Sequence, residues 1–174
     1  MAASPSRPPV GSIWTVRGVE NGHALVILGP IMREKTGSQF VVVPIYSGQE
    51  HGFGWSDQDV RLEPEETSYA APRFLGVWNA RPVYERELER FVMRVPDAHI
   101  AIAIAQDVYW AASQGRRLKH PRLGSPLREG TDTTHFQERE RKRWTSSLTS
   151  GPQESTGSDE KTEERTSDSG QAKS

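Results

Sequence analysis

Apolar residues stop recurring in this chain after Ser113, and that break divides the sequence before any motif is considered. Short apolar runs alternate with turn residues up to that point, whereas residues 114–174 are mostly charged residues, Ser, Thr, Gly and Gln. A segment of that composition buries too little apolar surface to offset roughly 1–2 kcal/mol of backbone entropy per ordered residue. The sequence therefore predicts an irregular leader over residues 1–10, one compact domain over residues 11–113 and a disordered charged tail over residues 114–174.

Composition narrows the class of protein. With 174 residues and 34% hydrophobic content, the chain has material for one core rather than two. It has no cysteine, which excludes disulfides, thiolate metal sites and cysteine nucleophiles and fits a reducing compartment. The first ten residues do not resemble a secretory signal, and no apolar run approaches the roughly 18 residues of a spanning helix. We therefore expect a soluble, cytoplasmic protein with no membrane partner.

The amino-terminal half predicts short strands. Alternation over residues 12–19, the turn dipeptide Asn21-Gly22 and the apolar run 24–28 predict a β-hairpin, and Gly29-Pro30 is expected to end its second strand. Residues 40–46 are rich in β-branched and aromatic types and predict a buried strand.

Later segments are less regular. A bulge, an edge or the strand's end is expected near Pro44, which has no N–H to donate. The glycine-rich residues 47–55 predict a surface loop, and further short strands are expected over residues 59–62, over residues 76–78 and around Val83.

Two helices are predicted to follow the strands. Apolar residues recur at helical spacing over residues 84–95, with charged residues between them, and Pro96 would end that helix. Asp97 suits an N-cap, and the length and alanine content of residues 98–113 favour a second helix, although residues 100–104 alternate as a strand would. The fold class predicted is mainly β with C-terminal helices (α+β), as a small SH3-like barrel.

Charge is distributed unevenly along the chain. Residues 1–113 carry a net charge of −3, residues 114–143 a net charge of +5 and residues 144–174 a net charge of −3. An anionic partner would therefore meet the basic segment more favourably than the domain, although short basic runs are commonly only solvated. The candidate nucleic-acid or partner contacts are Arg116, Arg117, Lys119, Arg122, Arg139, Arg141, Lys142 and Arg143. Residues 136–148 could also form a transient helix on a partner.

Three segments together resemble the PemK/MazF toxin family over about residues 11–112. They are residues 11–16 (GSIWTV), residues 23–28 (HALVIL) and residues 41–45 (VVVPI), and the late helix predicted to contain Leu88 follows them. The resemblance implies a PemK-like barrel that cleaves single-stranded RNA without a metal or cofactor, and implies a possible homodimer and a possible antitoxin or other protein partner.

The residues that carry catalysis in that family are changed here. The resemblance places the family's arginine, which precedes the second strand, at His23, and its hydroxyl residue, which ends the third strand, at Tyr46 with Ser47 beside it. A histidine can act as an acid or base near neutral pH, and a hydroxyl can contact a phosphate. His23, Tyr46 and Ser47 are thus the candidate catalytic residues of an endoribonuclease, and the alternative is a catalytically inactive barrel that serves as a protein-interaction or regulatory module.

Other groups of residues give weaker indications of metal binding, catalysis or base stacking. The five histidines have no ligand spacing, so no metal site is predicted. Asp57 and Asp59 could form a carboxylate pair but more simply cap turns in a loop. Trp55, Tyr69 and Trp78 could stack on bases, although aromatic residues in a small barrel more often form its core.

Overall fold

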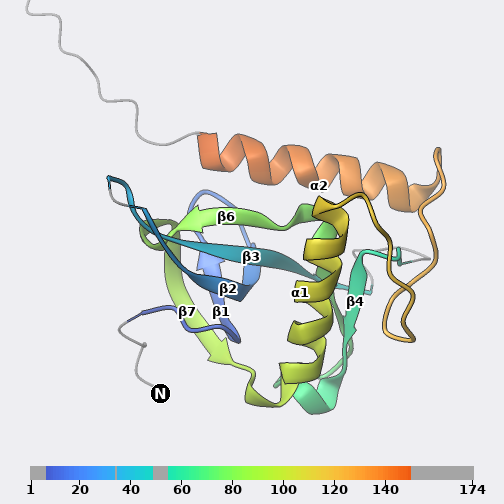
Figure 1. Cartoon of the computed structure of the whole chain (residues 1–174), viewed down its shortest axis with the longest axis horizontal. Helices are drawn as coiled ribbons and strands as arrows, with labels where there is room; N and C mark the ends of the chain where they lie inside the picture. Colours follow the sequence, from blue (N-terminus) through green and yellow to red (C-terminus); the bar gives the residue numbers. More distant parts are fainter. Residues whose placement is uncertain (1–6, 34, 49–54, 150–174) are drawn as a thin grey trace, which may run out of the picture.

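The computed structural model describes residues 7–33, 35–48 and 55–149, and over these ranges the protein is mainly β. An antiparallel sheet has the strand order β4-β5-β3-β2-β1-β7, with β6 paired to β3 beside that path, and two helices accompany it (Figure 1). The strands are β1 Ser12–Val16, β2 His23–Arg33, β3 Gly37–Ser47, β4 Asp59–Leu62, β5 Arg73–Gly76, β6 Arg81–Tyr84 and β7 Leu88–Arg94. The helices are α1 His99–Ser113 and α2 Asp132–Thr149.

The predicted first hairpin is confirmed as β1 and β2. Its turn contains Asn21 at a φ of 53°, a left-handed conformation that asparagine tolerates. The expected end of β2 at Gly29-Pro30 is wrong, because the strand continues to Arg33. Gly29 adopts a φ of 132°, and the pairing with β3 shifts register on either side of Leu28. The strand therefore passes this point through an irregularity that only glycine accommodates easily.

The predicted buried strand is confirmed as β3, which pairs with three other strands. One edge pairs with β2, while the other pairs with β6 over residues 39–42 and with β5 over residues 45–47. Pro44 pairs with Ala24 of β2 on one edge, and on the other edge it lies in the gap between β6 and β5, so the expected irregularity near Pro44 is a change of partner strand. The predicted strand over residues 76–78 is displaced, because the strand there is β5 and Val77–Asn79 form a 3-10 turn.

The predicted helix over residues 84–95 is wrong. Glu85–Glu87 form a single 3-10 turn, and Leu88–Arg94 form β7, which pairs with β1 across two register shifts. These bulges explain the misleading pattern, because an extra residue in a strand moves the next apolar side chain by three positions instead of two. Phe91 consequently meets Trp14 edge to face, with ring centroids 5.6 Å apart.

The second predicted helix is confirmed as α1. Its first turn differs from the prediction, because Pro96–Ala98 form a 3-10 turn and Ala98 occupies the N-cap position without a side-chain cap. Asp97 is therefore exposed in that turn and does not cap the helix.

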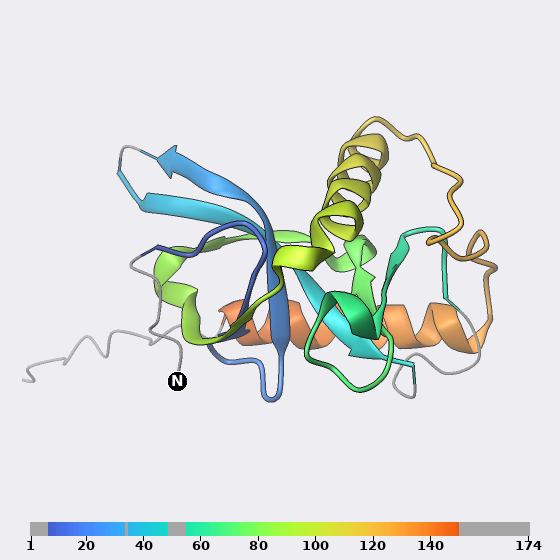
Figure 2. The ribbon, with the colours of Figure 1, turned by 90° about the horizontal axis from the view of Figure 1, so that it is seen from below.

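The two helices cover opposite faces of the sheet (Figure 2). Below α1 lies the larger core, whose cluster includes Ile13, Leu25 and Leu75 of the strands and Ala101 and Ala105 of the helix. On the other face, Trp144 of α2 completes a cluster with strand residues, and Phe136 of α2 packs in a second cluster. Because side chains alternate along a strand, β1, β2 and β3 each contribute both to the core below α1 and to the Trp144 cluster.

The predicted start of disorder at residue 114 is wrong for residues 114–149. Leu123 is 7% exposed, Phe136 8% and Trp144 1%. Val60 of β4 forms a bridge with Leu123, and the Arg61 N–H donates to the Arg122 carbonyl oxygen over 2.9 Å, so the segment after α1 covers the outer edge of the sheet. Residues 150–174 lie outside the described ranges.

Candidate functional site

The predicted catalytic residues lie on two different faces of the sheet. His23 is two residues from Leu25, and Ser47 is two residues from Ile45, so both side chains lie on the face that α1 covers. Tyr46 points to the opposite face, where its ring stacks on Trp78 with centroids 5.5 Å apart. The structure therefore allows His23 and Ser47 to share a site but does not bring Tyr46 to it.

Tyr46 instead belongs to a buried network beneath α2. Its side chain is 3% exposed, and its hydroxyl oxygen accepts a hydrogen bond from Asn79 Nδ2 over 3.3 Å. The Asn79 Oδ1 atom accepts in turn from the guanidinium of Arg81. Phe136 of α2 meets the tyrosine ring edge to face at 5.2 Å. Burial raises the pKa of Tyr46, so the phenol is a neutral structural group at physiological pH.

A row of polar side chains crosses the other face of the sheet, and we name it the polar strip. The strip follows pairs of residues that lie opposite each other on neighbouring strands. On β7, β1 and β2, Arg90 lies opposite Thr15, and Thr15 lies opposite His23. On the same face, Ser47 of β3 lies opposite Arg73 of β5. Four strand spacings of about 4.8 Å separate its two ends, so the strip is roughly 19 Å long. The polar strip comprises Thr15, His23, Ser47, Tyr69, Arg73 and Arg90.

Tyr69 connects the two halves of the polar strip from the loop between β4 and β5. Its hydroxyl oxygen lies 3.5 Å from His23 Nδ1, and the Arg73 guanidinium carbon lies 4.7 Å from its ring centroid. The Tyr69 N–H donates to Thr67 Oγ1 over 3.0 Å, which fixes the backbone of the turn. The Tyr69 hydroxyl therefore lies next to the His23 imidazole, the Arg73 guanidinium lies over the Tyr69 ring, and all three residues are half-buried.

An arginine lies at each end of the strip. Among the residues that the structure describes, neither Arg73 nor Arg90 forms an ion pair. Burial raises the pKa of Tyr69, and the charge of Arg73 opposes that rise only in part. Tyr69 is therefore a protonated hydrogen-bond donor at neutral pH. Thr15, His23 and Arg90 also line a cavity of about 470 Å³, but Glu20 and Glu89 line it as well, so the β7 end of the strip is less favourable to an anion than the Arg73 end.

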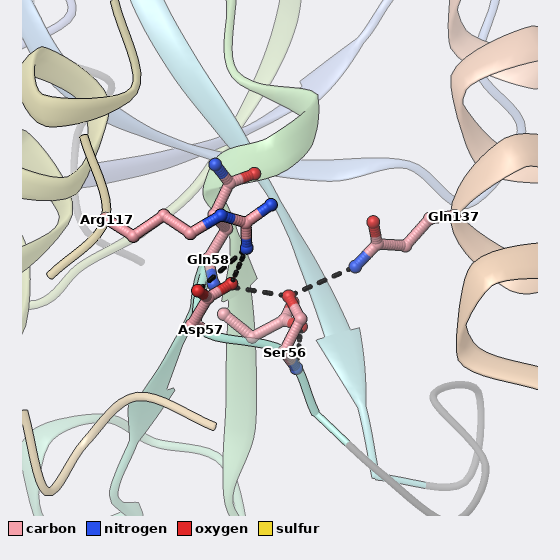
Figure 3. Close-up of polar contacts among 6 residues, drawn as sticks. Ser56, Asp57, Gln58, Arg117 and Gln137 are labelled. Atoms are coloured by element: carbon pink, nitrogen blue, oxygen red, sulfur yellow. Dashed lines mark hydrogen bonds and ion pairs between the residues drawn. The ribbon is translucent and has the colours of Figure 1, made fainter. Parts of the chain in front are cut away.

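The two aspartates of the predicted turn are buried rather than exposed. Asp59 is 0% exposed, and its carboxylate accepts from the Ser56 N–H, the Ser56 hydroxyl and Trp78 Nε1 over 2.7 to 2.8 Å. Asp57 accepts two hydrogen bonds from Arg117, over 2.7 and 2.8 Å. Figure 3 shows Arg117 reaching Asp57 from one side while Gln137 of α2 reaches Ser56 from the other. The Arg117 and Gln137 contacts attach residues 114–149 to the domain, and the Asp59 contacts hold Ser56 and Trp78 in place, so both aspartates have structural roles.

The predicted basic contacts divide into two groups. Arg117 pairs with Asp57, Arg122 pairs with Glu66 at 2.7 Å, and Arg143 pairs with Glu140 at 2.9 Å. The remaining five are exposed: Arg116, Lys119, Arg139, Arg141 and Lys142. None of the eight belongs to the polar strip. The residues that sequence reasoning missed are Arg73 and Arg90, and Tyr69 was considered only as a stacking or core aromatic.

Within residues 7–33, 35–48 and 55–149, no three His, Cys, Asp or Glu side chains gather closely enough to hold a metal ion. In the same ranges, neither helix combines the length and the apolar character needed to cross a membrane. No protein-family model matches the chain, and a search of curated proteins found no match either.

Proposed function

We propose that this domain binds single-stranded RNA along the polar strip and cleaves it without a metal ion. The observation that carries the proposal is the succession of His23, Tyr69 and Arg73, with Arg73 and Arg90 unpaired among the described residues. Unpaired guanidinium groups suit phosphate oxygens, which they can contact through two parallel hydrogen bonds. An acid–base pair beside them suits cleavage of the same phosphate.

The reaction that fits this set of groups is transesterification within the RNA. His23 accepts the proton of a ribose 2′-hydroxyl as its oxygen attacks the adjacent phosphorus. The bond from phosphorus to the 5′-oxygen breaks, and the Tyr69 hydroxyl donates a proton to that leaving oxygen. The products are a 2′,3′-cyclic phosphate and a free 5′-hydroxyl. Arg73 stabilises the negative charge that grows on the phosphoryl oxygens in the transition state.

An SH3-like, PemK-like barrel is the fold relation that we propose alongside this activity. His23 begins β2 and Ser47 ends β3. The resemblance assigns the toxin family's arginine to His23 and its hydroxyl residue to Tyr46, with Ser47 beside it. In this chain the guanidinium would come from Arg73 on β5, and Ser47, its register partner, would contact the phosphate.

The test is cleavage of a long single-stranded RNA by the full chain with a chelator present. We expect His23→Ala to slow cleavage by about 10²- to 10⁴-fold, the usual contribution of a general acid or base. Arg73→Ala should slow it by about 10²- to 10³-fold through lost charge stabilisation. Tyr69→Phe should reduce cleavage, whereas Tyr46→Phe should not, because Tyr46 lies on the opposite face. Arg94→Ala, at an exposed arginine of β7 outside the strip, is the charge-matched control.

Other outcomes are also decisive. Cleavage that survives both His23→Ala and Arg73→Ala would place the chemistry elsewhere. RNA binding that depends on Arg73 and Arg90 but never leads to cleavage would favour a binding module without catalysis. A folded protein that binds no single-stranded RNA at low salt would contradict both readings, because phosphate contacts are strongest under that condition.

A further inference from the structure

A second cavity lies beside the polar strip and shares two residues with it. It measures about 430 Å³ and is lined in part by Ser47, Arg61, Arg73 and Phe74. Ser47 and Arg73 belong to the polar strip as well, so an RNA strand bound there would continue past this cavity. Its volume is in the range of small-molecule sites and is sufficient for one nucleobase.

An aromatic wall forms one side of the cavity. Phe74 is half-buried, and Trp55 supports it from behind, with ring centroids 5.4 Å apart and planes tilted by 52°. Every nucleobase has a π-face, so a fixed phenyl ring of this kind is suited to stacking on an unpaired base.

Arg61 lies beside that wall. Arg61 and Phe74 are register partners on β4 and β5, and Phe74 is also the partner of Tyr46 on β3, so the Arg61 and Phe74 side chains lie next to each other on the face of Tyr46. The cavity therefore lies at the edge of the sheet, where Ser47 and Arg73 of the strip meet residues of the opposite face. Arg61 Nε lies 2.7 Å from Glu63 Oε1, an ion pair without aligned hydrogen-bond geometry. Its terminal nitrogens donate no hydrogen bond to a described residue.

The partner Glu63 distinguishes Arg61 from the strip arginines. Because the carboxylate balances the guanidinium charge, Arg61 is less suited to a phosphate than Arg73 or Arg90. Its free N–H groups still form a planar pair of donors, and a guanidinium has no acceptor. The complementary base edge is one with two acceptors. Guanine presents N7 and O6 on its outer edge, whereas adenine presents one acceptor and one donor there.

Resting on the proposed RNA binding, we infer that this cavity is a guanine-reading subsite, in which Phe74 stacks on the base and Arg61 donates to N7 and O6. Stacking on an aromatic side chain contributes about 1–3 kcal/mol per base, and a bidentate arginine–guanine contact discriminates by a similar amount. Arg61 is then a specificity-determining residue, and Glu63 is the group that orients it.

The experiment compares three ten-nucleotide uridine strands that carry guanine, adenine or 7-deazaguanine at one central position. Their riboses are 2′-O-methylated, which removes the nucleophile and prevents cleavage during the measurement. Binding to the full chain is followed by fluorescence anisotropy. We expect guanine to bind about tenfold more tightly than adenine or 7-deazaguanine, since the latter lacks only the N7 acceptor. Arg61→Ala should reduce this preference to less than twofold, and Glu63→Gln should weaken it.

Controls separate this inference from the function on which it rests. Arg90→Ala should weaken all three strands equally, and Arg94→Ala should weaken none. Circular dichroism confirms that each variant folds, and Phe74→Leu provides a second variant that should reduce affinity without removing the guanine preference. Equal affinity for the three strands, together with a loss on Arg90→Ala, would overturn the guanine subsite and leave RNA binding intact. Failure of the wild-type chain to bind any strand would overturn both.

Discussion

Replacing Trp144 by alanine tests the finding that α2 is part of the folded domain. The Trp144 side chain is 1% exposed, and it is the one described residue of α2 in a cluster otherwise made of residues 14–88. Removing a buried tryptophan typically costs about 3–5 kcal/mol of unfolding free energy. For a domain of this size, about 3 °C of melting temperature is lost per kcal/mol, so a decrease of roughly 10–15 °C is expected.

Thermal unfolding followed by circular dichroism measures this shift, and Trp110→Ala is the matched control. Trp110 lies on α1 and is 54% exposed, so the same substitution should lower the melting temperature by only a few degrees. A chain ending at Ser113, which lacks Leu123, Phe136 and Trp144, should be less stable than Trp144→Ala. Equal effects at Trp144 and Trp110, or an unchanged melting temperature after truncation, would refute the docking of α2.

Two further predictions concern other buried contacts. Burial raises the pKa of Tyr46 above the unfolded value of about 10, so the folded state holds the phenol proton more tightly than the unfolded state does. The stability that this proton contributes is therefore lost as pH rises above 10. Tyr46→Phe should reduce the loss of stability between pH 10 and 11.5, as measured by urea denaturation. Gly124→Ala should destabilise the protein, because a Cβ there would lie 1.9 Å from the Trp55 carbonyl oxygen. Gly48→Ala should not, because the nearest atom to a Cβ at that position lies 3.8 Å away. Melting temperatures of both variants equal to that of the wild type would contradict the close contact at Gly124.

Local sequence rules predicted the strands where turn chemistry and alternation agreed. The Asn21-Gly22 turn, the apolar run in β3 and the alanine-rich α1 each follow from backbone preferences that act within a few residues. The rules failed at β7, because bulges that depend on pairing with β1 gave its apolar residues a helical spacing. Such bulges are set by a partner strand more than 70 residues away, which no local pattern reports.

The sequence rules also failed to predict that the carboxyl-terminal segment docks on the domain, and the reason is related. Its composition is polar, but three apolar residues, Leu123, Phe136 and Trp144, are spaced so that each reaches a different part of the domain. Two ion pairs, Arg117 with Asp57 and Arg122 with Glu66, add contacts that average composition does not register. The site was likewise only partly predictable. His23 and Ser47 lie at the ends of two strands that are close in the sequence, so their proximity could be expected. Tyr69 and Arg73 come from a loop and a strand more than 20 residues further along the chain, and only the fold brings them to His23 and Ser47.

The two faces of the sheet separate the aromatic contacts to α2 from the proposed acid, base and charge-stabilising groups, although the proposed guanine-reading pair, Arg61 and Phe74, lies on the same face as Tyr46. Tyr46, Trp78 and the aromatic residues of α2 fill one face, while His23, Tyr69 and Arg73 lie on the other. The exposed basic residues of α2 therefore lie across the sheet from the strip. Charges further apart than about 10 Å interact weakly at physiological salt, so Arg139 and Lys142 would contribute little to the contacts of a short strand bound on the strip. A longer RNA that passes around the end of β3 could reach them, and only for such a ligand should the basic segment increase affinity.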